Sequence, residues 1–237
     1  MDLVTAVGGA DGPICVVGAG GKTTTMFALA HRLRRAVVTA TVNIPVFERE
    51  VERFEVTSDP VAALDTGAAF PLGVVPERVG KNRYRGYESA TVDGIAERHD
   101  GPVLVKADGA RMREFKAPGE NEPRIPVRAG VVVPVVSVHV VGKPLTEYWV
   151  HRPERVVALT GDEIGDEITA ETVATVLTHE HGGLKGVPPD ATVVPLLTKV
   201  DSPAHEQAAR EIAALTRESA DRIPRVALAR FDAFETV

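Results

Sequence analysis

The stretch VVGAGGKTTTMF, residues 16–27, decides the predicted fold, because an apolar strand, a glycine turn and the start of a helix follow one another in it. The usual phosphate-binding loop reads GxxxxGK(S/T), and GKT at residues 21–23 fills its end. Val16 stands where the first glycine of that pattern belongs, while Gly18 and Gly20 bring the flexible backbone two residues later. The order of these parts still predicts backbone N–H groups and a helix N-terminus that face an anion.

The predicted nucleotide site is centred on this loop. Its nucleotide-binding residues are expected to be Gly18, Ala19, Gly20, Gly21, Lys22, Thr23 and Thr24. Lys22 would reach the β- and γ-phosphates and act in catalysis, and the Thr23 hydroxyl would bind Mg²⁺. The alternative is an ordinary strand-to-helix turn that contains Gly-Lys.

Apolar segments alternate with helical patterns along the rest of the chain. Strands are expected at 14–17, 36–40, 70–75, 103–107, 131–138, 192–197 and 225–229. Most of them are apolar throughout, which is typical of parallel strands covered on both faces. One helix is expected at residues 22–34, and a second follows an N-cap at Thr169 and ends at residue 178. A third is expected to begin with Ser202 as N-cap and Pro203 as the first helical residue.

This alternation predicts the α/β class, with a three-layer, mostly parallel sheet of P-loop NTPase type. The length suits a single domain over residues 1–237, with an irregular loop region at about 108–160. That region is rich in proline, glycine and charge, and such loops after strands often carry function. It could equally be a plain surface excursion.

Composition narrows the classes of partner. The 237 residues carry a net charge of −6, and no basic or aromatic cluster favours nucleic acid. No apolar run is long enough to span a bilayer, and the single Cys15 fits a reducing cytoplasm. We therefore expect a cytoplasmic protein without nucleic-acid or membrane partners. His179 and His181 flank Glu180, a spacing that favours a solvated helix end over a metal site.

A second motif follows the predicted strand at 103–107. Asp108 ends this apolar segment, where a phosphate-loop protein places the acid that holds Mg²⁺. Asp108 is therefore a candidate metal ligand and catalytic residue, although an Asp-Gly pair also forms simple turns. Arg111, or Arg113 in the same loop, could stabilise charge at the γ-phosphate.

Two further candidates follow other strands. The sequence TKVD at 198–201 resembles the guanine-reading (N/T)KxD motif of GTPases, so Lys199 and Asp201 are candidate base contacts. Asp201 could instead simply begin the next helix. Thr41, after the second strand, could reach Mg²⁺, or could be there for its β-propensity alone.

Together these motifs resemble the YqeC family, accessory proteins associated with selenium-dependent molybdenum hydroxylases. The resemblance is carried by VVGAGGKTTT (16–25), VLVKADGAR (103–111), KAPGENEPRIP (116–126), GKPLTEYWVHRPERVVALTG (142–161), HEHGGLKGVP (179–188) and PLLTKVD (195–201). It implies a P-loop NTPase-like fold and an auxiliary role in maturing a molybdenum or selenium cofactor enzyme. A molybdenum hydroxylase, or the proteins that assemble its cofactor, would then be the partner.

The chain departs from that family pattern at two places. Lys106 stands where the family shows an acid, and the threonine run after the second strand reads TATVN. The first departure bears on hydrolysis more than on binding. The sequence thus predicts an Mg²⁺-dependent NTPase that uses ATP or GTP. The alternatives are a nucleotide-dependent transferase or ligase acting on a small anionic substrate, and a non-hydrolysing, nucleotide-gated chaperone.

Overall fold

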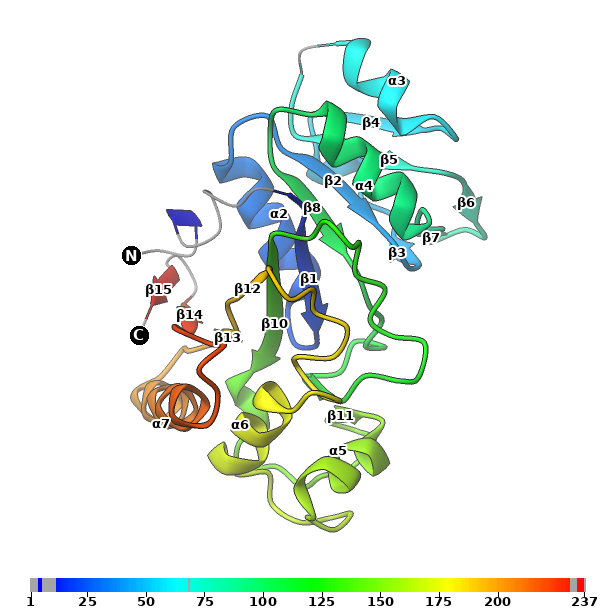
Figure 1. Cartoon of the computed structure of the whole chain (residues 1–237). Helices are drawn as coiled ribbons and strands as arrows, with labels where there is room; N and C mark the ends of the chain where they lie inside the picture. The colour runs from blue at the N-terminus through cyan, green and yellow to red at the C-terminus, as the bar shows by residue number, and fades with distance from the viewer. Residues whose placement is uncertain (1–3, 6–11, 68, 231–233, 237) are drawn as a thin grey trace.

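The computed structural model describes residues 4–5, 12–67, 69–230 and 234–236 (Figure 1). Its main sheet has ten strands in these ranges, in the order β15-β14-β13-β10-β1-β8-β2-β5-β4, with β12 paired to β10. The strands are β1 (Ile14–Gly18), β2 (Val37–Ala40), β4 (Arg53–Val56), β5 (Leu72–Val75), β8 (Val103–Lys106), β10 (Val131–Ser137), β12 (Thr192–Val193), β13 (Leu196–Thr198), β14 (Ala227–Ala229) and β15 (Phe234–Thr236). Every pair in this sheet is parallel except β14 with β15.

Helices cover both faces of the sheet (Figure 1). They are α2 (Lys22–Arg32), α3 (Pro60–Asp65), α4 (Ser89–Arg98), α5 (Pro153–Thr160), α6 (Ala170–Thr178) and α7 (Pro203–Ser219), with single 3₁₀ turns η1 (Glu48–Glu50) and η2 (Val138–Val140). In β1, Val16 packs in one core cluster with Met26 of α2, whereas Cys15 packs in another with Ile95 of α4. Alternate side chains of one strand therefore point to opposite helical layers, which explains its uninterrupted apolar run.

Two small sheets accompany the main one. One joins β3 (Ile44–Pro45), β7 (Arg83–Tyr84) and β6 (Arg78–Val79), and the other joins β11 (Val150–His151) to β9 (Phe115–Lys116). The second sheet and α5 lie inside the region expected to be irregular, so residues 108–160 are more regular than predicted. Pro153 occupies the first turn of α5, where its missing N–H costs nothing.

The mostly parallel α/β prediction is confirmed, and the departures from it are local. The strand expected at 192–197 divides into β12 and β13 around Pro195, which has no N–H to donate to a neighbouring strand. Helix α2 ends two residues early, because Leu33 is already extended. The predicted caps at Thr169 and Ser202 are both present, the first as a capping box.

The carboxyl ends of β1, β8, β10 and β13 meet at one edge of the sheet, because these four strands are adjacent and parallel. Loops that follow the strands therefore converge there, which is where α/β proteins build ligand sites. No helix in the described ranges is both long and apolar enough to cross a membrane.

Candidate functional site

The glycine loop is shaped by close backbone approaches. Gly18, Gly20 and Gly21 have φ values of 90°, 79° and 129°, a region that side chains other than glycine rarely adopt. A Cβ on Gly20 would lie 2.6 Å from Ser137 Cβ, so the loop also presses on the end of β10. Val16 lies deep in β1, paired with Val133 and buried, because the turn begins only at Gly18. The missing first glycine thus reflects a strand that runs further toward the loop.

Replacing Gly20 by Ala should lower the free energy of unfolding by about 2 to 4 kcal/mol, because strain at positive φ adds to the contact with Ser137. Gly94→Ala is the matched control, since Gly94 lies within α4 and an added Cβ there meets no atom within 4 Å. That control should leave stability unchanged or raise it by up to about 1 kcal/mol. Urea unfolding of both variants measures the difference, and equal effects would contradict this account of the loop.

The start of α2 is open to an anion. Its N-cap is Gly21, which has no side chain to cap the first N–H groups, and the first turn carries no acidic residue. Two other loop donors are already used, since Ala19 N donates to Val135 O at 2.8 Å and Gly20 N to Arg113 O at 3.0 Å. Phosphate binding would therefore rely on the α2 terminus and on Lys22 rather than on the whole loop.

Lys22 and Asp108 meet beside this helix terminus. Lys22 Nζ lies 3.1 Å from Asp108 Oδ1 and donates to Gly18 O, and both side chains are almost fully buried. Gly18 N donates to Asp108 Oδ2 at 2.8 Å, which anchors the carboxylate to the loop. Asp108 Oδ1 is buried and accepts no hydrogen bond from the described residues. A carboxylate oxygen is a ligand that Mg²⁺ prefers, so Asp108 fits that ion once Lys22 Nζ has moved away from Oδ1.

A chain of charges continues from Asp108, buried at Lys116 and half-buried at Glu122 and Arg152. Lys116 Nζ lies 3.0 Å from Asp108 Oδ2 and 2.8 Å from Glu122 Oε2, and Arg152 Nη1 lies 2.9 Å from that same Glu122 oxygen. We call Lys22, Asp108, Lys116, Glu122 and Arg152 the buried charge network. Reasoning from sequence assigned no role to Lys116 or Glu122. The available signal was their position in KAPGENEPRIP, one of the segments that carry the family resemblance.

Lys106, at the position where the resemblance implies an acid, lies against the same network. Its Nζ donates to Asp108 O at 2.7 Å and to Asn43 O at 2.9 Å. Burial, followed by repulsion from Lys22, lowers the pKa of Lys106 to about 7. Burial also lowers the pKa of Lys22, although Asp108 opposes the shift. Cationic side chains outnumber carboxylates among these groups, so the site favours an anionic ligand.

Glu122 should make stability depend on acid pH. Burial raises its pKa, but hydrogen bonds and charges from Lys116 and Arg152 outweigh burial and lower the pKa to about 2. A depressed carboxyl pKa stabilises the folded state above the unfolded value of about 4.5. This stabilisation, about 1 to 2 kcal/mol after allowance for partial exposure, is lost as the pH falls from about 4.5 to 2.

In urea unfolding at several pH values, Glu122→Gln should remove that part of the pH dependence and be less stable than wild type at pH 7. Glu147→Gln serves as the control, because Glu147 is exposed and makes no contact with the buried charge network. This variant should keep the wild-type dependence of stability on pH. A Glu122→Gln profile parallel to wild type between pH 5 and pH 2 would show that Glu122 is not the titrating group.

The remaining magnesium and catalytic candidates differ in position. Thr41 is buried after β2, and its hydroxyl donates to Arg124 O at 2.6 Å. Arg111 is exposed with φ at 46°, and among the described residues no contact joins it to Lys22 or Asp108. The structure therefore brings Lys22 and Asp108 together, places Thr23 next to Lys22 in the first turn of α2, and shows no contact of Arg111 with that pair among the described residues.

The residues of the TKVD segment contact different parts of the protein. Thr198 donates to Gly20 O, which ties β13 to the glycine loop. Lys199 has φ at 61° and its Nζ lies 2.6 Å from both oxygens of Glu114. Asp201 is exposed and its Oδ2 lies 3.1 Å from His139 Nε2. The two predicted base contacts thus already have protein partners.

A cavity of about 860 Å³ adjoins the buried charge network. Thr41, Glu122 and Arg152 line it, and three further arginines stand on its wall: Arg85, Arg124 and Arg155. The arrangement offers an arginine-lined space beside the Glu122–Arg152 end of the buried charge network, wide enough for a small anionic molecule.

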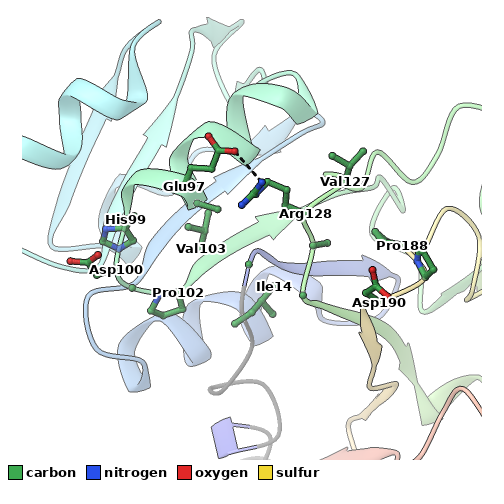
Figure 2. A pocket seen from close by; sticks show the side chains of 16 residues that line it. Ile14, Glu97, His99, Asp100, Pro102, Val103, Val127, Arg128, Pro188 and Asp190 are labelled. Carbon is green, nitrogen blue, oxygen red and sulfur yellow. Dashed lines mark ion pairs between the residues drawn. The ribbon is translucent and has the colours of Figure 1, made fainter.

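Another cavity, of about 950 Å³, lies at the opposite edge of the sheet (Figure 2). Ile14 and Val103, the first residues of β1 and β8, line it, and Arg128 pairs with Glu97 at 3.1 Å across it. Ligands of parallel α/β sheets bind at the carboxyl ends of the strands, so we place the functional site at the other edge.

The fold and site define an α/β protein whose glycine loop and buried charge network meet at the carboxyl edge of a mostly parallel sheet. The chain belongs to the YqeC family, since the family profile described as "YqeC protein" matches residues 14–154. The "Uncharacterized protein YqeC" of Escherichia coli (strain K12) is 30% identical over 188 residues, which cover 74% of this chain and 71% of that protein. The predicted family is confirmed. No solved structure matches the chain, so the P-loop NTPase type stays a prediction.

Proposed function

We propose that the chain binds a nucleoside triphosphate with Mg²⁺ at the glycine loop and hydrolyses it. The observation that supports this most directly is the buried Lys22–Asp108 pair beside the uncapped start of α2. When a nucleotide arrives, Lys22 would turn from Asp108 to the phosphates, and Asp108 together with Thr23 would hold the ion. Both exchanges replace one charge pair by another, so neither leaves a buried charge unpaired.

Water is the acceptor in this proposal, so no protein nucleophile is required. Bound Mg²⁺ would neutralise charge that develops on the phosphates during the reaction. Within the chain, Lys22 would stabilise the transferred phosphoryl group, and Arg111 would have to move inward to assist it. The role in maturing a molybdenum or selenium hydroxylase rests on the resemblance alone.

A thermal-shift panel of ATP, GTP, ADP and GDP, each with and without Mg²⁺, tests the proposal. A nucleotide at 100 times its Kd should stabilise the folded chain by about 2.7 kcal/mol. Mg²⁺ should increase the rise in melting temperature that triphosphates cause. Without Mg²⁺, Asp108 holds Lys22, and the ion would take the place of Lys22 beside Asp108 and release the lysine to the phosphates. A GTP preference would support base reading by Asp201, whereas no shift with any nucleotide would overturn the proposal.

A second candidate is a nucleotide-dependent transferase or ligase, and the 860 Å³ cavity favours it. Its arginines could hold a small anion close to the transferred phosphate. Free phosphate released without an added acceptor supports hydrolysis. Phosphate release that requires a small carboxylate or phosphate ester supports transfer.

A further inference from the structure

Two imidazoles and a carboxylate gather at the carboxyl edge of the sheet, outside the buried charge network. His139 lies in η2, Asp201 follows β13, and His205 lies in the first turn of α7. One ligand atom from each lies within 4.8 Å of the others. The two rings have centroids 4.5 Å apart, and His139 Nε2 lies 3.1 Å from Asp201 Oδ2.

The backbone around each imidazole is held in place by a neighbouring hydroxyl. His139 N donates to Ser137 Oγ at 3.3 Å, and His205 N donates to Ser202 Oγ at 3.2 Å. The second bond is the N-cap of α7, a helix of 17 residues, so His205 is attached to a long element. Both rings are therefore carried on anchored backbone, which limits the rearrangement needed to side-chain rotation.

One polar atom in the cluster lacks a protein partner. His205 Nδ1 is buried and forms no hydrogen bond with the described residues. A buried ring nitrogen without a partner is costly unless water or an ion satisfies that nitrogen. The neighbouring imidazole and carboxylate offer the remaining ligands for such an ion.

We propose that His139, Asp201 and His205 bind one divalent transition-metal ion of the zinc class. Two imidazoles and a carboxylate are ligands that Zn²⁺ and its neighbours prefer over Mg²⁺. Metal–ligand distances of about 2.0 to 2.2 Å place tetrahedral ligands about 3.3 to 3.6 Å apart. The His139–Asp201 pair already has nearly that spacing, and rotation of the His205 ring would bring the third ligand in.

The proposed site is an open one. Three protein ligands leave at least one coordination position for water or a bound molecule, unlike a closed four-ligand structural site. The ion would also occupy Asp201, the carboxylate predicted to read guanine. Metal binding and guanine contact would therefore compete for one side chain, although the metal site does not depend on nucleotide binding.

Metal titration of the full, tag-free chain tests this proposal. After treatment with a chelator, the protein competes with a chromophoric chelator for Zn²⁺ in the absence of nucleotide. Wild type should bind one equivalent, and excess Mg²⁺ should not displace it. His139→Gln and His205→Gln should each weaken the Kd by more than about 100-fold, since losing even an outer partner costs about 10- to 100-fold.

His181→Gln is the matched control, because His179 and His181 form the other histidine pair, with ring centroids 5.6 Å apart. Among the described residues, no carboxylate lies close enough to both of these rings to share a metal ion with them. The control should therefore bind Zn²⁺ as wild type does. Co²⁺ bound to wild type should show visible absorption bands of the intensity typical of tetrahedral coordination, and these should be lost in His139→Gln and His205→Gln. Wild type without a Zn²⁺ equivalent, or His139→Gln and His205→Gln that bind as wild type does, would overturn the proposal.

Discussion

Asp108→Asn should lower the free energy of unfolding by about 3 to 5 kcal/mol, the cost of leaving buried charges without their partner. Asp108 is in contact with both Lys22 and Lys116, and those three side chains are each at most 7% exposed. The Asn side chain has nearly the same shape and can still accept the hydrogen bond from Gly18 N. The loss of stability therefore measures the effect of removing the negative charge. Urea unfolding at pH 7 measures it.

A control and a double variant make that expectation sharper. Asp65→Asn, at the exposed end of α3, should change stability by no more than about 0.5 kcal/mol. Combining Asp108→Asn with Lys116→Met removes a carboxylate together with one of the cations it neutralises. The double variant should be at least about 1 kcal/mol more stable than the sum of the single effects predicts. Strict additivity would contradict direct coupling of the two residues.

Lys22→Ala should abolish most nucleotide-dependent stabilisation. If the substitution weakens the nucleotide Kd by about 100-fold, a ligand concentration of 100 times the wild-type Kd stabilises the variant by only about 0.4 kcal/mol, against about 2.7 kcal/mol for wild type. The physical reason is the loss of the ammonium group that, in the proposed function, would bind the phosphates beside the α2 terminus. Each variant is compared with its own melting temperature without ligand, because Lys22 also belongs to the buried charge network.

Lys81→Ala provides the control for that experiment, since Lys81 is exposed in the turn between β6 and β7. It should show the full nucleotide shift. Lys22→Arg keeps a charge but changes its shape and reach, so it should recover only part of the shift. A Lys22→Ala shift equal to that of wild type would remove the glycine loop from the proposed function.

The layers of the fold could be predicted from local patterns. Apolar runs such as 103–107 predicted buried parallel strands because a strand covered on both faces needs apolar residues at every position. The glycine positions predicted the turn after β1, since only glycine adopts positive φ without strain. The phosphate-loop motif in turn predicted that Asp108 would act at the same site as Lys22, and the two side chains lie 3.1 Å apart.

Contacts inside the long loop could not be predicted in this way. Lys116 and Glu122 stand among prolines and glycines, where no periodic pattern indicates which side chains turn inward. Their pairing with Asp108 and Arg152 depends on how residues 109–130 fold back over the sheet edge. Only the packed structure shows that this loop completes a buried charge network.

The sequence by itself determined the α/β class, the helix caps at Thr169 and Ser202 and the family, because each depends on residues close together in the chain or on whole motifs. Tertiary structure alone decided the partners of Lys199 and Asp201. Glu114 and His139 reach them across the carboxyl edge of the sheet, from 85 and 62 positions away in the chain. Charge pairs across such separations follow from strand order and loop path, which no local pattern encodes.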